Sequence, residues 1–430
     1  MRKGLTYVIQ DSEKFKTKLL YWSQNFTHAI GLDSNNYPQN AKEFDFLLAV
    51  DSFSLIQTKD LDYLFQLKEY QINTGDWLFG YLSYDVKNAI EKLDSTNFDG
   101  LHFPDLFFFQ PKKIFILKDN VLQILYLPQF EDEIKKDLES IEKIDLNHPD
   151  EDSEPIKIKL RIHKDEYFNK VNSLLEHIHR GDIYEINFCQ EFYAEETRLN
   201  PVETYLKLNK ISKPPFAVYL KLDDKYLMSA SPERYLQKKG RTVVSQPIKG
   251  TAKRADNEVE DEKLRVELSK DSKEQSENIM IVDLVRNDLS RVAIKGSVKV
   301  EELCKVYTFE QVHQLISKVT CEVENKVHPV DIIKATFPMG SMTGAPKISA
   351  MRLIEEHEET KRGVYSGAVG YFKPNGDFDF NVVIRSILYN QTNKYVSYSV
   401  GGAITAMSDP VLEYEECLIK AKAMREVLEN

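Results

Sequence analysis

A chain of 430 residues with 42% hydrophobic and 29% charged residues is long enough for two domains, or one large compound domain, of a soluble globular protein. Its 68 acidic and 57 basic residues give a formal net charge of −11, which argues against a nucleic-acid or membrane-surface partner, so an anionic ligand needs local cations or a metal. Four cysteines without CxxC spacing, no apolar signal core after Met1 and no apolar run near the length of a membrane span lead us to expect a soluble, cytoplasmic protein with reduced thiols.

The first 150 residues alternate short apolar runs with polar segments, which predicts the strands of a mixed sheet. The clearest runs are 46–50, 77–81, 106–109, 114–117 and 121–127. A charge-dense stretch, 131–154, follows and ends at Pro155, so we place a domain boundary there. We expect an N-terminal scaffold over residues 1–155, with a regulatory ligand pocket as the alternative, and a second domain over residues 156–430.

Helical and strand patterns alternate after residue 155. Helical spacing is seen in Tyr167, Val171, Leu174, Leu175 and Ile178. Gly181 supplies a C-terminal stop for this helix. Residues 183–194 then alternate as a strand that turns Glu185, Asn187 and Cys189 to one side. Residues 221–230 predict one further strand.

A single lysine stands between two residues with special backbone behaviour in the segment Gln246-Pro-Ile-Lys-Gly-Thr251. Pro247 fixes its own φ and lacks an N–H donor, whereas Gly250 lets the chain turn or lie close to a ligand. Taken alone, Lys249 is most simply a solvated surface charge, because lysine is rarely buried without a partner.

Acidic residues mark two predicted helices. Glu277 lies on a helix from about 273 to 291, and Asp409-Pro410 is a good start for a C-terminal helix. Glu413, Glu416 and Lys420 then share one face of that helix. Without further information, this face is interpreted as a solvated stripe with a Glu416–Lys420 pair.

Several small or cationic residues could bind anions. The loop 340–347 lacks the Gly-Lys-Ser/Thr ending of a nucleotide-binding loop. We interpret it instead as a loop whose backbone N–H groups and hydroxyls, from Ser341 and Thr343, face a carboxylate at a helix start. Small residues at 401–403 (Gly401, Gly402 and Ala403) would allow a second carboxylate to approach the backbone. Arg385 offers a bidentate grip on a carboxylate.

Pro247-Ile-Lys-Gly-Thr251 resembles the signature of chorismate-utilising enzymes, in the form carried by component I of aminodeoxychorismate synthases. The related anthranilate synthase component I has alanine at the position of Lys249. Further segments match the family in the same order, namely Ser231-Pro-Glu-Arg234, Asp283-Leu-Val-Arg-Asn-Asp288, Gly340-Ser-Met-Thr-Gly-Ala-Pro-Lys347, Tyr365-Ser-Gly367, Val383-Ile-Arg385 and Gly401-Gly-Ala-Ile404. Because these matches occur in the same order over roughly residues 160–428, a chance resemblance is very unlikely.

The resemblance implies an α+β fold of the anthranilate synthase component I type, with two facing, mostly antiparallel β-sheets and helices packed outside. It also implies that Glu277 and Glu416 bind Mg²⁺, a hard cation that suits carboxylates. Glu274 and Glu413 are nearby alternatives that we expect outside the metal's own ligands. Tyr365 and Lys420 complete the substrate-binding set of Ser341, Thr343, Arg385, Gly401, Gly402 and Ala403.

By resemblance, the amine of Lys249 adds to chorismate at C2 while Glu233, as general acid, protonates the departing C4 hydroxyl. Ammonia then attacks C4 and expels the lysine, which leaves 4-amino-4-deoxychorismate. A lysine with a solution pKa near about 10.4 must be neutral to attack, so we expect burial or a neighbouring cation to depress the pKa of Lys249. The pKa of Glu233 must be raised for it to donate a proton. Arg234 would oppose that shift, so we expect it to point away.

No glutaminase setting is visible around the cysteines, so ammonia is expected from a separate glutamine amidotransferase subunit, for 4-aminobenzoate and folate synthesis. The alternative activity is that of anthranilate synthase component I in tryptophan synthesis. Lys249 discriminates between the two activities, because anthranilate synthases have alanine at this position. A ligand-sensing or inactive scaffold subunit is the alternative outside the enzymes. Two residues depart from the family pattern: Glu185 stands where glutamine is usual, and Gln314 where a histidine is frequent. His313, beside Gln314, is expected to be a core histidine.

Overall fold

The computed structural model describes residues 2–37, 43–58, 62–91, 93–146, 155–309 and 312–429. Its strands are β1 (Lys3–Val8), β2 (His28–Asp33), β3 (Phe46–Thr58), β4 (Leu78–Leu82), β5 (Leu106–Lys118), β6 (Val121–Tyr126), β7 (Lys159–Leu160), β8 (Glu185–Ala194), β9 (Phe216–Leu222), β10 (Lys225–Ser231), β11 (Arg234–Lys239), β12 (Thr242–Gln246), β13 (Ile248–Lys253), β14 (Lys299–Thr308), β15 (Val312–Glu322), β16 (Gly344–Ala345), β17 (Ala368–Phe372), β18 (Phe378–Val382), β19 (Ser386–Asn390) and β20 (Tyr395–Thr405). Its helices are α1 (Ser12–Ser23), α2 (Tyr63–Thr74), α3 (Lys87–Glu91), α4 (Ile134–Glu142), α5 (Lys164–Arg180), α6 (Pro201–Ser212), α7 (Glu258–Lys270), α8 (Ser272–Ser290), α9 (Pro329–Thr336), α10 (Lys347–His357) and α11 (Pro410–Glu429), with short 3₁₀ turns η1 (Tyr84–Val86), η2 (Pro128–Glu133) and η3 (Gly340–Met342). None of the helices in these ranges has the length and apolar character needed to span a membrane.

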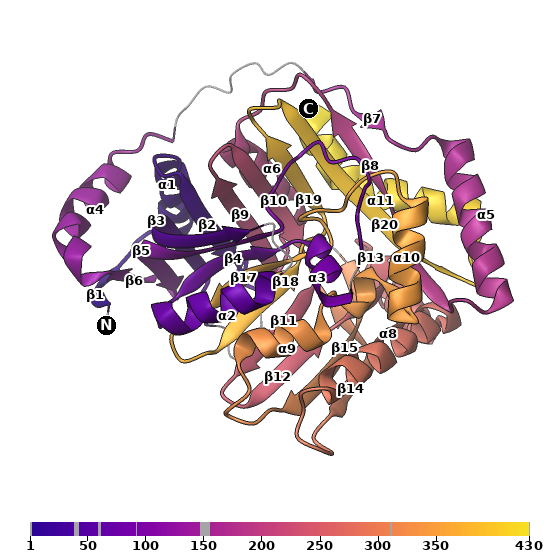
Figure 1. Cartoon of the computed structure of the whole chain (residues 1–430). Helices are drawn as coiled ribbons and strands as arrows, with labels where there is room; N and C mark the ends of the chain where they lie inside the picture. The colour runs from indigo at the N-terminus through magenta and orange to yellow at the C-terminus, as the bar shows by residue number, and fades with distance from the viewer. Residues whose placement is uncertain are drawn as a thin grey trace.

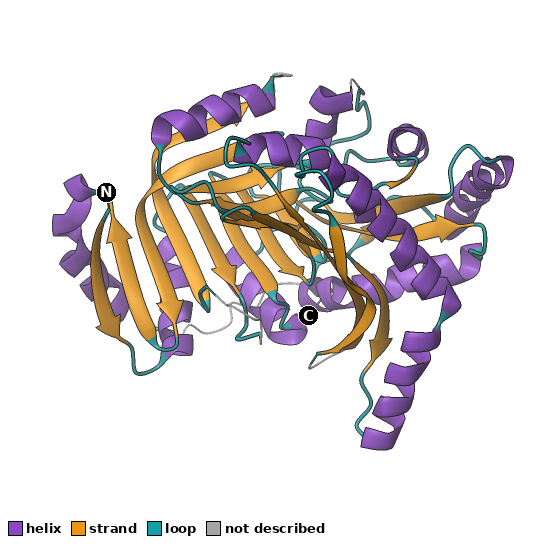
Figure 2. Ribbon diagram, turned by 90° about the horizontal axis from the view of Figure 1, so that it is seen from below, coloured by secondary structure: helices purple, strands orange, loops and turns teal. Residues whose placement is uncertain are grey.

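The strands form two antiparallel sheets that share β5. The first sheet runs in the order β1-β6-β5-β3-β2-β9-β10-β19-β20-β8. The second leaves β5 through β4 and continues as β17-β18-β11-β12-β15, with β13 and β14 both paired to β15. Figure 2 shows the strands side by side with helices packed around them. The expected α+β class, with antiparallel sheets and outer helices, is confirmed.

Alternation along the first sheet separates two apolar cores. On β9, Val218, Leu220 and Leu222 face a core that also contains residues of the second sheet, whereas Ala217 and Tyr219 face a core with α1, α5, α6 and α11. A strand turns successive side chains to opposite faces, so one sheet can be buried on both sides. The two sheets therefore face each other across the first core.

The two parts of the chain on either side of residue 155 share these sheets. β2 pairs with β9, and β4 pairs with β17. Within the charge-dense stretch, η2 and α4 are helical, whereas residues 147–154 lie outside the described residues. The division into 1–155 and 156–430 stays a prediction.

Local sequence signals predicted several elements of the second half correctly, with one error. α5 ends at Gly181, whose φ of 89° is left-handed, as the stop signal predicts. The single strand expected over residues 221–230 is wrong, because β9 and β10 form a hairpin there. The turn passes through Asp223 with a φ of 53°, which is a conformation that Asp tolerates better than most residues.

A buried ion pair joins three distant segments beside the sheets. Arg362 and Glu358 are each 5% exposed, and their closest N–O distance is 2.6 Å. Arg362 also donates hydrogen bonds to the carbonyl oxygens of Met342 and Asn187 and stacks over the ring of Tyr84. The pair therefore holds η1, β8 and η3 together.

Removing the charge of Glu358 should destabilise the protein, because a buried guanidinium would lose its counter-ion. We expect Glu358→Gln to lower the free energy of unfolding by about 3 kcal/mol. Urea unfolding measures the change, with Glu195→Gln as a control because Glu195 pairs with Lys159 on the surface. A Glu358→Gln protein as stable as the control would mean that the remaining hydrogen bonds suffice for Arg362.

Candidate active site

Residues that are far apart in the sequence converge where the two sheets meet α8 and α11. Figure 1 places β8, β13, β20, α8 and α11 in the same half of the molecule. α8 packs against β13, and α11 packs against β20. Lys249 comes from β13, at the start of a strand that Pro247 separates from β12.

Lys249 is paired with a carboxylate from the facing sheet. Its Nζ lies 3.2 Å from Oε1 of Glu185 on β8, and the two side chains are 12% and 2% exposed. Burial alone would lower the pKa of Lys249, but Glu185, together with Glu277 and Glu233, outweighs burial and raises that pKa above its ordinary value. The expected depression of the lysine pKa is therefore wrong, because the surrounding charges are carboxylates.

Glu233 has the environment of a proton donor. The side chain is buried, and the Ser341 hydroxyl donates a hydrogen bond of 2.7 Å to its Oε1. Burial raises the pKa of Glu233 to about 7, although the Ser341 bond and the charge of Lys249 oppose the rise. Arg234 points away, as expected, with Nε 2.9 Å from Oδ1 of Asp379.

Two capped helices bring further carboxylates to the site. Asp271 accepts hydrogen bonds from the first turn of α8, and Asp409 does the same for α11. Glu277 and Glu413 are 7% and 1% exposed, and Lys273 Nζ lies 3.9 Å and 3.1 Å from their respective Oε1 atoms. Burial raises the pKa of Glu277 to about 7.

Glu416 faces the same space as Glu413 from the next turn of α11. A Cβ built on Gly402 would lie 3.2 Å from Glu413 Oε2 and 3.8 Å from Glu416 Oε1. Lys420 Nζ lies 2.5 Å from Glu416 Oε1, so the predicted i,i+4 pair forms. Lys420 also donates a hydrogen bond to the Gly401 carbonyl, which ties α11 to β20.

These carboxylates have the donor chemistry that Mg²⁺ prefers. Glu277 Oε1 and Glu413 Oε2 are buried without a hydrogen-bond partner in the described part of the chain. No three His, Cys, Asp or Glu side chains in those ranges lie close enough to form a complete protein cage. Mg²⁺ commonly takes one or two carboxylates and fills its other positions with water and ligand oxygens. The donor set therefore fits such an ion.

A cavity of about 220 Å³ carries three cationic side chains, and two of its lining residues, Pro232 and Thr251, are close in the sequence to Glu233 and Lys249. The three cations are Lys213, Arg385 and Lys420, and Gln314 and apolar side chains of α6 and α11 are among the other lining residues. Arg385 is one of these lining residues, and its guanidinium can donate two parallel hydrogen bonds to the carboxylate of an anionic ligand. Burial lowers the pKa of Arg385, and the nearby Tyr365 and Glu416 oppose this effect.

The remaining predicted anion-binding residues are spread around this space. The Thr343 hydroxyl donates to carbonyl oxygens of its own loop, and Tyr365 Oη lies 3.4 Å from Cys189 Sγ. Residues 401–403 belong to β20 and pair with β8 in register. Their binding of a ligand, like the roles of the other site residues, stays a prediction.

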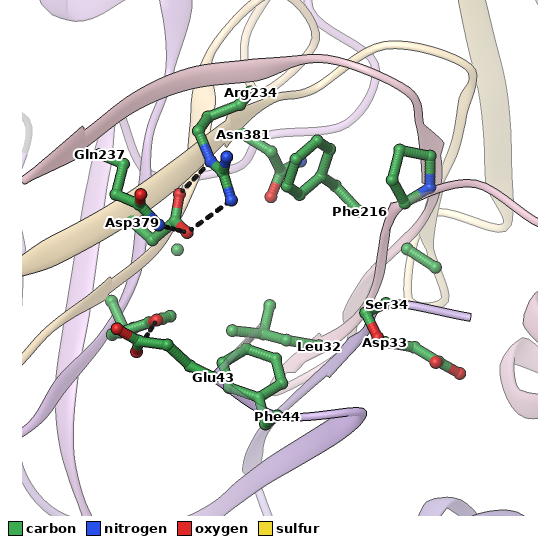
Figure 3. A pocket seen from close by; sticks show the side chains of 14 residues that line it. Leu32, Asp33, Ser34, Glu43, Phe44, Phe216, Arg234, Gln237, Asp379 and Asn381 are labelled. Carbon is green, nitrogen blue, oxygen red and sulfur yellow. Dashed lines mark hydrogen bonds and ion pairs between the residues drawn. The ribbon is translucent and has the colours of Figure 1, made fainter. Parts of the chain in front are cut away.

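A second, smaller pocket lies between the sheets (Figure 3). Its volume is about 70 Å³, and its wall combines the Arg234–Asp379 ion pair with apolar side chains such as Leu32, Phe44 and Phe216. The regulatory pocket considered for the N-terminal part stays a prediction.

The sequence does not reveal the partners that position the predicted site residues. Glu185 departs from the family pattern, and strand alternation predicts the face to which its side chain points, but no local signal places it opposite Lys249. Lys347 Nζ pairs with Asp288 at 2.5 Å and donates to the carbonyl oxygen of Pro338, which anchors the loop that carries Ser341. His313 is fully buried and contacts Asp261 and Thr308, so its expected place in the core is confirmed.

Comparisons with known proteins agree on one family. The model described as chorismate binding enzyme matches residues 17–426. A Synechocystis protein named anthranilate synthase component I-like is 37% identical over 83% of this chain and 73% of its own length. Aminodeoxychorismate synthase component 1 of Bacillus subtilis is 33% identical over 81% of this chain and 76% of its own. The crystal structure of anthranilate synthase component I from Streptococcus pneumoniae superposes with a TM-score of 0.78 at 27% identity, covering 90% of this chain and 93% of that one.

Proposed function

Because this chain belongs to the family of chorismate binding enzymes, we propose that it is component I of an aminodeoxychorismate synthase, which converts chorismate and ammonia to 4-amino-4-deoxychorismate. One observation carries the proposal. Lys249, the residue that would form the covalent bond, is 12% exposed and its charge acts on the buried Glu233, while their chain neighbours Thr251 and Pro232 line a cavity together with Arg385 and Lys420. A primary amine next to a proton donor is the arrangement that covalent amination requires.

The proposed reaction has two displacement steps. The neutral amine of Lys249 forms a bond to C2 of the ring, the double bond shifts, and the C4–O bond breaks as Glu233 gives its proton to the leaving hydroxyl, which departs as water. Ammonia then bonds to C4, and the bond from C2 to Lys249 breaks. Glu233, with a pKa raised to about 7, is protonated in about half of the molecules at neutral pH.

Two kinds of positive charge would hold the dianionic substrate. Arg385 and Lys420 reach the cavity as cations, and Arg385 can grip a carboxylate with two parallel hydrogen bonds. Mg²⁺ held by Glu277 and Glu416 would supply the charge for a second carboxylate. These charges offset the overall negative charge of the protein near the site.

Glu416→Gln should weaken the proposed magnesium dependence, because one charged ligand is lost. We expect the Mg²⁺ concentration for half-maximal activity to rise by about tenfold or more, with a higher KM for chorismate. Mg²⁺ titrations at fixed chorismate measure this, and Glu415→Gln, an exposed neighbour on α11, is the control. An unchanged metal requirement would transfer the ligand role to Glu413.

The ammonia is proposed to come from a glutamine amidotransferase subunit. The curated relative from Bacillus subtilis is named as component 1, which implies a second component in that protein. The product would pass to a lyase that forms 4-aminobenzoate for folate synthesis.

The alternative is anthranilate synthase component I, and the names of other relatives favour it. Product analysis separates the two activities. The protein is incubated with chorismate, Mg²⁺ and an ammonium salt, and fluorescence is recorded before and after a lyase is added. The proposal requires 4-aminobenzoate that forms only with the lyase, whereas fluorescent anthranilate from the protein alone would refute it.

A further inference from the structure

The Lys249–Glu185 ion pair favours the charged form of the amine, whereas the proposed reaction needs the neutral form. The amine has to be neutral when it attacks the ring, yet Glu185 and the other carboxylates raise the pKa of Lys249. The proton must therefore leave Nζ within the closed site before the new bond forms. Some group close to Nζ has to accept it.

Glu185 meets the geometric requirements for that acceptor. Among the described residues it is the carboxylate within ion-pair distance of Nζ, at 3.2 Å. Its second oxygen, Oε2, is buried and has no hydrogen-bond partner in the same ranges, so this oxygen has room for a proton. The pair lies between β8 and β13, and both side chains are nearly closed off from solvent. A proton can pass between the two groups without a water molecule.

We propose that Glu185 is the catalytic base that takes a proton from Lys249 before the amine attacks and returns it when the lysine is expelled. This role rests on the proposed function. In the first transfer, an N–H bond of the ammonium breaks and an O–H bond forms on Glu185, so Lys249 becomes a neutral amine. The amine then bonds to C2 and becomes a secondary ammonium, while Glu233 gives a separate proton to the leaving hydroxyl.

The second half of the cycle restores the pair. When ammonia bonds to C4, it becomes the ammonium group of the product, and the electrons of the C2–N bond return to Lys249 as a neutral amine. Glu185 gives its proton back to this amine, and Glu233 is reprotonated from solvent. The two glutamates therefore handle different protons, one at the nucleophile and one at the leaving group.

Glu185→Gln tests the proposal, because the amide keeps the shape and can accept a hydrogen bond but cannot take a proton at neutral pH. We expect kcat with ammonia to fall about 100-fold at neutral pH, with KM for chorismate changed by less than about threefold. The ratio of variant to wild-type kcat should then rise about tenfold per pH unit above neutrality, because solvent must remove the proton from Lys249. Taking the ratio cancels the contribution of Glu233 to both profiles.

The other carboxylates around Lys249 make the opposite outcome possible, namely a Glu185→Gln variant that is faster than the wild type. Lys249 also faces Glu277 and Glu274 on α8, Glu233 after β10 and Glu416 on α11. If Glu185 only held the lysine in its charged form, Glu185→Gln would raise kcat. A faster variant, or a kcat ratio that does not change with pH, overturns the proposal.

Two control variants separate this role from a folding effect. Glu191→Gln makes the same change on the same strand, at a buried carboxylate that contacts Arg161 and Tyr395, and it should keep the wild-type pH profile. Glu185→Asp keeps a carboxylate and should retain the wild-type profile at a reduced kcat; a profile like that of Glu185→Gln would count against the base. The identity of the product separates a failure of the proposed function from a failure of the role of Glu185. Anthranilate from the wild type would overturn the proposed function and this role together, whereas aminodeoxychorismate from a fully active Glu185→Gln protein would overturn only the role of Glu185.

Discussion

Lys249→Ala should lower the formation of 4-amino-4-deoxychorismate by at least about 10⁴-fold, because the reaction loses the group that forms the covalent bond. Ammonia could still reach C2 of bound chorismate directly, so slow formation of anthranilate is expected in its place. Chromatography of the products at saturating ammonium chloride measures both compounds. Lys253→Ala, at an exposed position on the same strand, is the control and should retain full activity.

This variant also separates chemistry from binding. Alanine leaves Arg385 and Lys420 in place, so chorismate should still bind, and calorimetry can establish this without turnover. Undiminished output of aminodeoxychorismate from Lys249→Ala would contradict the role of the lysine as nucleophile.

Glu233→Gln should lower kcat by about 10³-fold, because the leaving hydroxyl loses its proton donor. The pH dependence follows from the raised pKa. Glu233 is protonated below its pKa of about 7 and ionised above it, so wild-type kcat/KM should fall by about tenfold per pH unit on the alkaline side. Glu233→Gln should lose this alkaline limb, and pH profiles of both proteins measure the difference. An alkaline limb that persists in the variant would assign it to another group.

The same substitution should act in the opposite direction on stability. The pKa of Glu233 is higher in the folded protein than its ordinary value of 4.5, so the folded state binds the proton more tightly. The stabilisation from protonation is fully present below pH 4.5 and is lost as the pH rises through about 7. At pH 8 Glu233→Gln should therefore unfold at a higher urea concentration than the wild type.

The parts of the fold that local sequence signals govern could be predicted. The stop at Gly181 and the start at Asp409-Pro410 placed the ends of two helices, because the residues at helix ends act through nearby backbone groups. The hairpin between β9 and β10 was missed, since Asp223 and Asp224 resemble ordinary strand-flanking polar residues.

Sequence motifs nominate the residues of the candidate site, but they do not predict which charges lie beside each of them. Lys249 and Glu233 lie in ordered motifs, and the family resemblance adds Glu277 and Glu416; the roles of all four stay predictions. The pairing of Lys249 with Glu185 depends on how two sheets meet, and strand patterns carry no information on that contact. For this reason the sequence suggested a depressed lysine pKa, whereas the assembled site raises it.

The central claim is that Lys249 becomes covalently bonded to chorismate, and intact-mass spectrometry without ammonia tests it most directly. The protein is mixed with chorismate and Mg²⁺, quenched in acid and digested to locate the modification. The account predicts a mass increase equal to chorismate minus water on the peptide that contains Lys249, which a supply of ammonium salt removes. Aminodeoxychorismate produced by a protein that never carries this adduct would contradict the account.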